Sequence, residues 1–406
     1  MKLKHKVVKY AVNIVTQLQE AGYEAYIVGG AVRDLLLGKT PKDYDISTIA
    51  TPEQIRKVFG RRKCRIIGRR FKLVHLYVGK EVVEISTFRR TPKKKQPVHL
   101  KKRFKTPEKM IFHDNEYGSV EEDASRRDFT VNALYYDPIT DKIRDFTGNG
   151  LKDIKKGLVR VIGDPHTRFE EDPVRVLRAL KLVGQYNFRM TKDTEKALKS
   201  SLNLLAHVAP ARLCLEFEKI MLSPYCVEIL TTLKKYGLLS YIAPYIDEKW
   251  DSSEAAYMRE LLKIKAERTA NNEYRSSISI SLAALILPFL EKEIGFADTG
   301  ALWMNNQHTK SEIRDLLTEI IYPHNFCKDI LHATTRILAL QPDFVENWDR
   351  TLTACKGYQH ARELMVLQNK ALWHDDRLEN IWPKYPPSNR RTKSRRSGRF
   401  HDKKRK

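Results

Sequence analysis

Short β-rich runs and helical stretches mix in the first third of the chain. Between residues 6 and 145, runs rich in β-branched and aromatic residues are separated by stretches with helical spacing of the apolar positions. This mixture is typical of an α/β or α+β unit. The strands are expected at residues 25–28, 44–47, 73–78, 82–88 and 131–136.

From about residue 151 the pattern becomes helical and amphipathic. Val174, Leu177, Leu180 and Val183 recur at three-residue steps and predict one buried helix face. Leu, Ile and Ala keep three- and four-residue spacings to about residue 382. The expected fold is therefore a mixed α and β region followed by all-α regions, with boundaries at residues 1–150, 151–239 and 240–385.

Residues 386–406 differ from the rest of the chain in composition. They contain almost no apolar residue and many Ser, Arg and Lys, so they cannot bury enough surface to fold alone. We expect a disordered basic tail. Across the whole chain, 42% hydrophobic residues is ample for folded cores and excludes a disordered or collagen-like protein.

Positive charge is concentrated in two segments. The chain has 74 Lys and Arg against 50 Asp and Glu, a formal net charge of +24. Residues 56–105 carry 19 basic residues against two Glu, and residues 389–406 carry ten against one Asp. Charge gathered in this way favours a polyanionic partner, and nucleic acid is the expected one. An anionic membrane surface and general solubility are the alternatives.

The apolar runs and the cysteines favour the cytoplasm. The longest apolar run, residues 282–290, is less than half of the ~20 residues that a membrane span needs. The first 26 residues have no unbroken apolar region, so no secretory signal is expected. Five scattered cysteines without a Cys-x-x-Cys pair argue against a disulfide framework or a zinc site.

A pair of glycines marks the first candidate site. Gly29 and Gly30 end an apolar strand and begin a helical run that stops at Gly38. Because these glycines have no β-carbon, a triphosphate can approach backbone N–H groups near the start of the helix.

Two aspartates follow in the next expected strand. Asp43 and Asp45 alternate with Tyr44 and Ile46, so the two carboxylates are expected on one face of the strand. Carboxylates this close repel each other unless a cation lies between them. Mg²⁺ accepts such oxygen ligands together with substrate phosphates. The alternative is that the pair caps a turn.

Glu84 is a third candidate metal ligand. It is an acidic residue within a basic segment, in the strand expected at residues 82–88. Three carboxylates on neighbouring strands predict two Mg²⁺ ions, one that lowers the pKa of an attacking hydroxyl and one that neutralises a leaving pyrophosphate.

Two further motifs carry arginines beside acidic residues. Arginine forks such as those of Arg126 and Arg127 suit phosphate oxygens, and the adjacent Asp128 can hydrogen-bond to a ribose hydroxyl. Asn132 belongs either to this pocket or to the hydrogen bonding of buried backbone. In the second motif, Asp172 followed by Pro173 is explained by an ordinary helix start.

The same helix start also has a functional interpretation. Arg175, Arg178 and Lys181 recur at three-residue steps and form a basic stripe opposite the apolar face. An Asp and an Arg three residues apart on a helix can offer paired acceptors and donors to the edge of a base. Both roles are compatible.

Taken together, these motifs resemble the class II template-independent nucleotidyltransferases, which include CCA-adding enzymes and bacterial poly(A) polymerases. The resemblance covers residues 27–213, with the motifs in family order. They are Gly29-Gly30-x-Val32-Arg33-Asp34 with Asp43-x-Asp45, Arg126-Arg127-Asp128-Phe129-Thr130-x-Asn132-Ala133, and Glu171-Asp172-Pro173-x-Arg175-x-Leu177-Arg178-Ala179.

The resemblance implies an architecture and a set of roles. Residues 1–150 would form a nucleotidyltransferase head, residues 151–239 a helical neck that holds the base, and residues 240–385 an RNA-binding body. Asp43, Asp45 and Glu84 would bind two Mg²⁺ ions. The residues expected to bind ATP are Gly29, Gly30, Arg33, Arg127, Asp128, Asn132, Asp172, Arg175 and Arg178.

Two basic segments favour a poly(A) polymerase over a CCA-adding enzyme. Residues 66–76 resemble a segment that marks the bacterial poly(A) polymerases, and cations beside Phe71 suit an RNA 3′ end. A basic tail would hold RNA of any sequence through its phosphates. The residues expected to bind RNA are Arg69, Arg70, Lys72, Arg390, Arg391, Arg395 and Arg396. The alternatives are a CCA-adding enzyme and a non-catalytic RNA-binding protein on a decayed polymerase fold.

Overall fold

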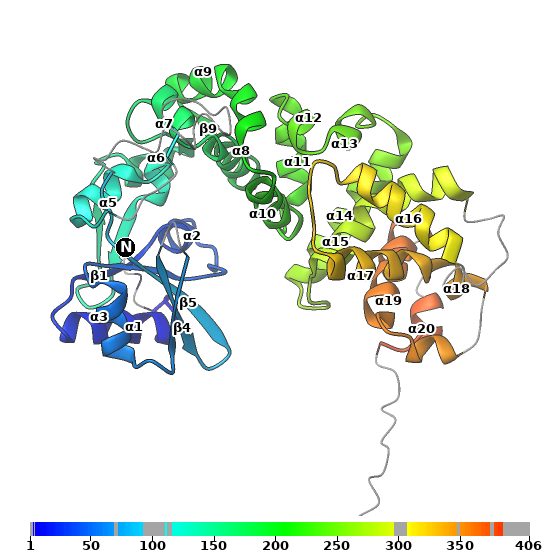
Figure 1. The fold of residues 1–406 in the computed structure, drawn as a ribbon, viewed down its shortest axis with the longest axis horizontal. Coiled ribbons are helices and arrows are strands. Elements are labelled where there is room, and N and C mark those ends of the chain that lie inside the picture. The colour runs from blue at the N-terminus through cyan, green and yellow to red at the C-terminus, as the bar shows by residue number, and fades with distance from the viewer. Residues whose placement is uncertain are drawn as a thin grey trace, which may run out of the picture.

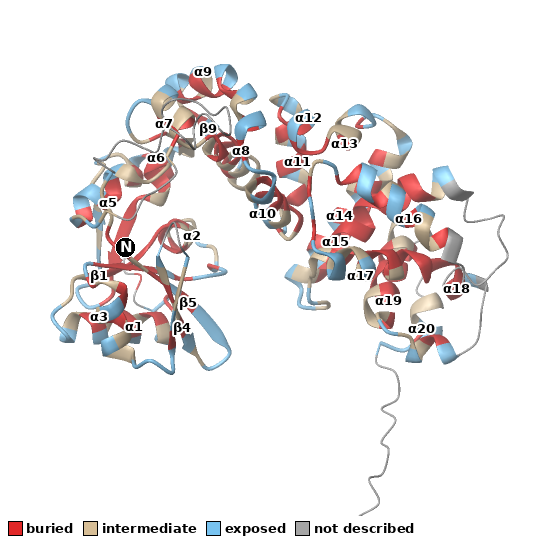
Figure 2. Cartoon of the chain, in the orientation of Figure 1, coloured by how far each residue is buried: buried red, intermediate tan, exposed pale blue. Residues whose placement is uncertain are grey.

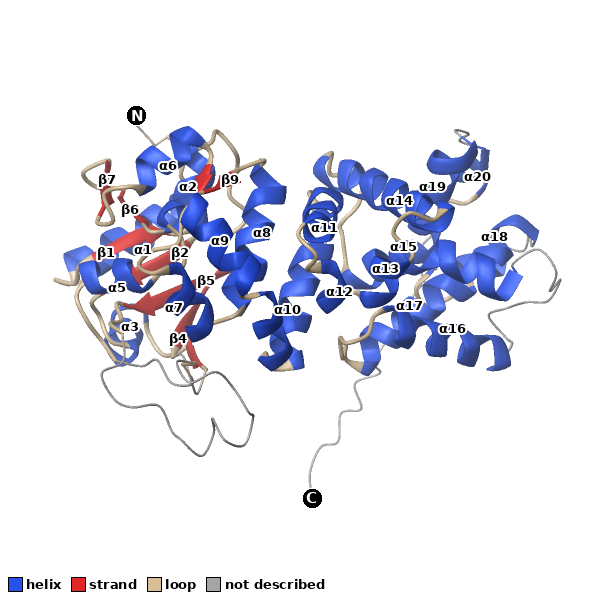
Figure 3. Cartoon of the chain, turned by 90° about the horizontal axis from the view of Figure 1, so that it is seen from above, coloured by secondary structure: helices blue, strands red, loops and turns tan. Residues whose placement is uncertain are grey.

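The computed structural model describes residues 3, 5–68, 72–91, 110–111, 116–295, 307–346, 350–373 and 377–384. Figure 1 shows an arch with a sheet-containing head at one end, a helical body at the other, and helices of the neck between them. The seven-stranded sheet lies at the head end, and the body is built from helices (Figure 3). The predicted α+β head followed by a helical neck and body is confirmed.

The head is built on one sheet with strand order β3-β4-β5-β2-β1-β6-β7. Neighbouring strands are antiparallel except β2 and β5, which run parallel and place Ile46 opposite Ile85. This pairing brings the start of β2, where the predicted aspartates lie, beside the middle of β5. The strands are β1 Ala25–Val28, β2 Asp45–Thr48, β3 Cys64–Ile67, β4 Leu73–Val78, β5 Glu81–Thr87, β6 Leu134–Asp137 and β7 Lys142–Asp145.

The strand expected at residues 131–136 begins later than predicted. Thr130–Asn132 form a 3₁₀ turn, η1, and the strand β6 starts at Leu134. The backbone N–H of Thr130 donates to the carbonyl of Arg160 at 3.0 Å, and the N–H of Ala133 donates to Thr130 at 3.1 Å. Because these groups bond outside the sheet, the segment cannot join the ladder.

Four helices of the head are described. α3 illustrates how the sequence starts a helix, because Thr51 and Gln54 form a reciprocal capping box and Pro52 occupies the first turn. α1 buries Ala11, Ile14 and Leu18 on one face, at the spacing of an amphipathic helix. The helices are α1 Lys9–Glu20, α2 Gly30–Leu36, α3 Pro52–Phe59 and α5 Val120–Arg126.

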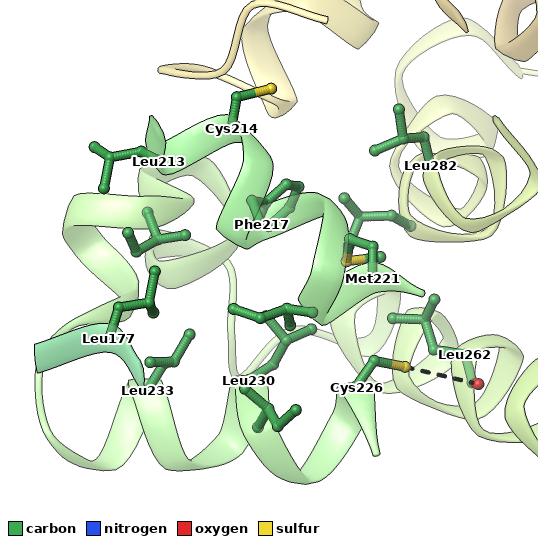
Figure 4. Close-up of a cluster of buried hydrophobic side chains, with 14 of the residues drawn as sticks. Leu177, Leu213, Cys214, Phe217, Met221, Cys226, Leu230, Leu233, Leu262 and Leu282 are labelled. Atoms are coloured by element: carbon green, nitrogen blue, oxygen red, sulfur yellow. Dashed lines mark hydrogen bonds between the residues drawn. The ribbon is translucent and has the colours of Figure 1, made fainter. Parts of the chain in front are cut away.

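The neck packs three helices closely. α8 buries Val174, Leu177 and Leu180 as predicted, and it lies against α10 and α11. A β-carbon at Gly184 would come within 2.8 Å of the Cα of Ile229, so only glycine permits this approach of α8 to α11. Figure 4 shows the apolar side chains between these helices, including Leu177, Phe217, Leu230 and Leu233. The elements are α6 Gly150–Lys156, β8 Leu158–Val159, α7 Pro165–Glu171, α8 Val174–Tyr186, β9 Arg189–Met190, α9 Lys192–Ser200, η2 Leu202–His207, α10 Pro210–Met221 and α11 Cys226–Lys235.

The body surrounds a buried central helix. Every residue of α15 from Ser279 to Leu290 is buried, and Figure 2 shows the burial concentrated in this part of the body. A helix that is apolar on all sides must be enclosed by others, here α14, α16, α17 and α19. The body helices are α12 Leu239–Ile242, α13 Pro244–Glu248, α14 Ser253–Ala270, α15 Ile278–Leu290, α16 Gln307–Ile320, α17 Lys328–Ala339, α18 Gln341–Glu346, α19 Tyr358–Gln368 and α20 Arg377–Ile381.

Short turns of 3₁₀ or π type complete the body. They are η3 Glu291–Gly295, η6 Arg350–Ala354 and η7 Asn369–Trp373. Within the described ranges, no helix is long and apolar enough to cross a membrane. The tail predicted at residues 386–406 lies outside the described residues, and the division of the chain at residues 150, 239 and 385 stays a prediction.

Candidate functional site

A cavity of about 450 Å³ lies between the head and helices α8 and α10 of the neck. Gly29, Gly30 and Ala31 form part of its head-side wall, and Leu182 and Gln185 line the side of α8. The cavity is rich in charge of both signs. Its cations are Arg33, Lys42, Arg127, Arg178, Lys181 and Lys219, and its acids are Asp34, Asp43, Asp45, Asp128 and Glu216.

A second cavity of about 400 Å³ adjoins the first. The two share Arg127, Asp128 and Arg178 in their walls. Asp172 and Arg175 line only the second cavity. It is also lined by Leu73, Arg89, Ile111, Arg126, Glu171 and Arg212. The shared residues place the two cavities side by side along one wall.

The predicted aspartate pair faces the first cavity. Tyr44 and Ile46 are buried while Asp43 and Asp45 are exposed, so the alternation expected of this segment is present. Asp43 itself precedes β2, which begins at Asp45. Although Asp45 as a whole residue remains exposed, the protein around its carboxyl partly desolvates that group, and the charges of Glu84 and Asp43 repel its ionised form. Together these effects raise the pKa of Asp45 to about 6.

This unneutralised negative charge fits a divalent cation. Asp43 and Asp45 would supply hard oxygen ligands, and the remaining positions around Mg²⁺ are commonly filled by substrate phosphates and water. Throughout the described part of the chain, no group of three or more Asp, Glu, His or Cys side chains is arranged to hold a metal ion. Asp43 and Asp45, which face one cavity, could by themselves supply two of the ligands that such a cation needs.

Glu84 is only partly placed as predicted. It lies near enough to Asp45 to raise the pKa of that carboxyl. However, Glu84 does not line the first cavity, and its side chain is 53% exposed. Its carboxylate Oε1 lies 3.4 Å from Nε2 of His75, directly opposite on β4. Asp43, Asp45 and Glu84 therefore do not form a preassembled cluster of three carboxylates. A metal-binding role for Glu84 stays a prediction.

Gly29 has a conformation that requires glycine. Its φ of 73° is positive, and a β-carbon there would lie 3.6 Å from an Nη atom of Arg127. The N–H of Gly29 donates to the carbonyl of Leu134 at 3.4 Å. This amide is therefore used within the fold. The positive φ is what requires glycine here, because a β-carbon 3.6 Å from Arg127 would make only an ordinary van der Waals contact.

Arg33 and Asn132 are joined in a chain of side-chain hydrogen bonds. Arg33 donates to Oδ1 of Asn132 at 2.6 Å and to Oδ1 of Asp34 at 2.8 Å. The amide of Asn132 then donates to Oδ1 of Asp128 at 3.2 Å. The Asn132 side chain thus bonds to other side chains of the cavity, and these contacts do not satisfy buried backbone.

Arg127 is held from three sides beneath the cavities. Its guanidinium donates to the hydroxyl of Tyr135 at 2.8 Å, to Oγ of Ser47 at 3.1 Å and to Asp123 at 3.1 Å. It also lies over the ring of Tyr135, 5.0 Å from the centroid. Burial alone would raise the pKa of Asp123, but Arg127 and the Tyr135 hydroxyl outweigh it and lower that pKa. The network keeps Arg127 fixed where both cavities meet.

Asp172 does not cap helix α8 as an ordinary helix start would require. It ends α7, and the residue before α8 is Pro173, without a side-chain cap. The Asp172 carboxylate is instead paired with Arg212 of α10 at 3.0 and 3.1 Å. The interpretation of this residue as an N-cap is wrong, because the nearby guanidinium is the stronger partner for a carboxylate.

Sequence comparisons match two segments of the chain. Residues 25–160 match the poly A polymerase head domain, and residues 187–249 match a probable RNA and SrmB-binding site of polymerase A. Poly(A) polymerase I of Haemophilus influenzae is 41% identical over 286 residues, which is 70% of this chain and 62% of the relative. The corresponding protein of Salmonella typhi is 40% identical over 309 residues, 73% of this chain and 65% of the relative.

Over these segments the chain is similar to the class II nucleotidyltransferases. The CCA-adding enzyme of Geobacillus thermodenitrificans, from the same family, is 37% identical over 262 residues, 64% of this chain and 61% of the relative. The chain spans less than two thirds of the length of each of these curated relatives.

Solved structures agree with the fold. The CCA-adding enzyme of Bacillus stearothermophilus in complex with CTP has a TM-score of 0.59 at 24% identity, and covers 92% of this chain and 83% of its own. A tRNA nucleotidyltransferase complexed with a primer tRNA and an incoming ATP analog has a TM-score of 0.54 at 25% identity, with coverage of 91% and 96%.

The first cavity contains charged residues that sequence reasoning missed. Glu216 of α10 accepts hydrogen bonds from Arg178 at 3.1 and 3.3 Å, and Lys219 lies 3.4 Å from it. Burial would raise the pKa of Glu216, but Arg178 and Lys219 outweigh it and lower that pKa, so Glu216 stays ionised. The signal that could have identified Glu216 is an acidic residue next to Phe217, at a position on the buried face of α10.

The residues expected to bind RNA are almost all outside the described part of the chain. Arg69, Arg70, Arg390, Arg391, Arg395 and Arg396 lie there. Lys72 is described and exposed, and the next residue, Leu73, lines the second cavity. One residue of the segment at 66–76 that is expected to meet an RNA 3′ end, Leu73, therefore lies at the cavity that contains Asp172 and Arg175.

Proposed function

We propose that this chain transfers AMP from ATP to the 3′-hydroxyl of RNA without a template, as a poly(A) polymerase. The observation that carries the proposal is the pair of joined cavities, one with the two aspartates among cations and the other with Asp172 and Arg175. In the reaction the 3′ oxygen forms a bond to the α-phosphorus, the bond to pyrophosphate breaks, and the hydroxyl proton is released.

The first cavity would hold the triphosphate. Lys42, Lys181 and Lys219 present ammonium groups to it, and Arg127 and Arg178 present guanidinium groups where the two cavities meet. Asp43 and Asp45 would hold Mg²⁺, which when bound neutralises phosphate charge and favours the ionised 3′ oxygen. Such a site acts by positioning and by electrostatic stabilisation, without a covalent intermediate.

The second cavity would hold the base. Arg212 fixes the Asp172 carboxylate from α10, and Arg175 is held by the carbonyl of Arg168 at 2.7 Å and by Glu171 at 3.3 Å. With both side chains fixed, the protein itself would present donors and acceptors to the base edge. Relatives named poly(A) polymerase I, at about 40% identity, support adenine as the base.

A CCA-adding enzyme is the second candidate. Its support is the 37% identity to the enzyme of Geobacillus thermodenitrificans and the fold shared with CCA-adding enzymes. The cavities alone do not distinguish ATP from CTP, because Asp172 and Arg175, which would contact the base edge, occur in the motifs that both kinds of enzyme share.

An assay with two acceptors separates these functions. With Mg²⁺ and ATP alone, we expect an oligoadenylate primer to gain a long run of AMP residues, measured on a denaturing gel. In parallel, a tRNA that lacks its terminal CCA is incubated with all four nucleotides. Use of CTP and termination after a single A would support the CCA-adding activity instead. Absence of incorporation into either acceptor, with intact RNA binding, would favour a non-catalytic binder.

The lowered pKa of Lys181 leads to a prediction of how nucleotide binding depends on pH. Burial lowers the pKa of Lys181 to about 8, with the charges of Lys219 and Arg178 acting in the same direction and Glu216 opposing them. Lys181 is therefore charged below about pH 8 and neutral above it, so ATP affinity and kcat/KM should fall as the pH rises from 7 to 9. Lys181→Arg, which stays charged, should remove most of this fall and also controls for the titration of ATP itself. An equal fall in both proteins would refute the assignment.

A further inference from the structure

Lys39 of the head lies between two tyrosines of the neck. Its ammonium group donates to the hydroxyl of Tyr225 at 2.9 Å, and it lies 4.4 Å from the centroid of the Tyr225 ring and 4.8 Å from that of Tyr186. A cation over two aromatic faces is attracted by both rings. We call these three residues the lysine clamp.

Tyr186 also binds the helix that lines the first cavity. Its hydroxyl donates to Oδ1 of Asp34 at 2.6 Å and accepts from Arg33 at 2.6 Å. The guanidinium of Arg33 lies over the same ring, 4.5 Å from its centroid. Arg33 and Asp34 belong to α2 and line the first cavity, so the clamp connects directly to one of the cavity walls.

Helix α8 carries the opposite wall and is held against the head at both of its ends. Near its start, Arg168 of the preceding helix donates to the backbone carbonyls of Arg126 and Arg127. At its end, Tyr186 is the last helical residue and makes the contacts with α2. Between these two attachments α8 presents Arg178 and Lys181 to the first cavity.

We propose that Lys39 is a positioning residue for the nucleotide. By holding Tyr186 and Tyr225 to the loop that follows α2, it sets the separation between the head wall with Asp43 and Asp45 and the neck wall with Lys181. A triphosphate must contact both walls at once, so a wider gap weakens its binding even though no ligating side chain is changed. This inference rests on the proposed function.

The clamp depends on charge as well as shape. Lys39 does not line either cavity, so its effect on a nucleotide is transmitted through Tyr186 and α2. Arg also carries a cation and stacks on aromatic rings, whereas Met matches the length of Lys without the charge. Lys39→Arg should therefore preserve the clamp and Lys39→Met should open it.

The test measures ATP affinity and turnover separately on the full chain. Binding of a fluorescent ATP analogue with Mg²⁺ is titrated without RNA, and KM and kcat are measured with an oligoadenylate primer. For Lys39→Met we expect about five- to tenfold weaker binding, which corresponds to about 1–1.4 kcal/mol, and a similar rise in KM for ATP, because the cation no longer holds the two rings. The value of kcat should change less than KM, since the groups at the reacting atoms are intact.

Three further variants make the result specific. Lys39→Arg should restore affinity to within about twofold of the unchanged chain. Tyr225→Phe removes only the hydrogen bond and should give an intermediate loss, which also provides a test if Lys39→Met does not fold. Lys199→Met is the matched control, because Lys199 is an exposed neck lysine paired with Glu195 at 2.9 Å, away from the cavities.

Unchanged ATP binding in Lys39→Met would overturn the proposal, as would an equal loss in Lys39→Arg. A loss of affinity that appears only where the melting temperature also falls would assign Lys39 to stability alone and equally overturn it. Failure of the proposed function is distinguishable. In that case the unchanged chain itself would transfer no AMP, while its nucleotide affinity and the effect of the variants on that affinity remain measurable.

Discussion

Asp45→Asn is expected to reduce AMP transfer by at least about a thousandfold while leaving the melting temperature equal to or above that of the unchanged chain. The substitution keeps the shape of the side chain and removes one of two carboxylates proposed to hold Mg²⁺. A loss of about 4 kcal/mol in transition-state stabilisation corresponds to this factor.

The stability expected of this variant follows from the pKa of Asp45. Folding raises the pKa of Asp45 to about 6, so the ionised carboxyl lowers the stability of the fold at neutral pH. This destabilisation is absent when the group is neutral. Removing the charge should therefore not lower stability. Incorporation of labelled AMP and a thermal melt at pH 7.5 measure the two effects.

Asp251→Asn serves as the control for this experiment. Asp251 is an exposed aspartate of the body, and neither cavity includes it. The Asp251→Asn variant should retain full AMP-transfer activity. If Asp45→Asn kept more than a tenth of the activity of the unchanged chain, Asp45 would not be a metal ligand. Loss of activity accompanied by a large fall in melting temperature would point to a structural role.

Arg127→Met is expected to destabilise the head by about 3–5 kcal/mol, the usual cost of leaving one member of a buried ion pair behind. The Asp123 side chain is only 8% exposed and would lose its cation, and the Tyr135 hydroxyl would lose its donor. Urea unfolding followed by far-UV circular dichroism measures the change. Arg61→Met, at an exposed arginine of the same head, is the control and should change stability little.

The pH dependence of this loss has a definite sign. In the unchanged chain the pKa of Asp123 is lowered, so its ion pair stabilises the fold above the unfolded pKa of about 3.9 and is lost as the pH falls through the lower folded value. In Arg127→Met the unpaired carboxyl is expected to accept a proton more readily. The difference between the two proteins should therefore narrow as the pH is lowered towards 4.

A double variant tests whether the ion pair is the cause. Asp123→Asn combined with Arg127→Met removes the stranded charge and should recover part of the lost stability, since residues in direct contact are not additive. If the loss of unfolding free energy in the double variant equals the sum of the losses in the two single variants, the destabilisation arises from packing around Tyr135. The charge of Asp123 is then not responsible.

Local sequence patterns predicted much of the head and the neck. The strands at residues 25–28 and 73–78 agree with β1 and β4, and the strands containing Ile46 and Ile85 are displaced by one residue at their ends. The apolar spacing along α8 also agreed with its buried face. These features depend on residues close in sequence, whose side-chain periods of two and 3.6 are set by backbone geometry.

The strands β3 and β7 and the turn at Thr130 were missed because their apolar patterns are weak or misleading. β7 alternates exposed and partly buried residues at the edge of the sheet, where one side lacks a neighbour. Thr130 belongs to a segment with strand-like composition, but its backbone bonds to Arg160, thirty positions later. The secondary structure of such segments is set by the residues that they contact in the folded chain, and these contacts override local propensity.

The order of amino acids is enough to show which residues are available for chemistry. The glycine pair, the alternating Asp43 and Asp45, and the basic stripe of α8 are visible in that order alone, since each depends on short spacings. Only the tertiary structure decided their partners: His75 beside Glu84, Arg212 on Asp172, and Lys39 between two tyrosines. Arg212 is 40 residues from Asp172, and Lys39 is 186 from Tyr225. Contacts over such distances follow from how the helices and the sheet pack, which no local pattern specifies.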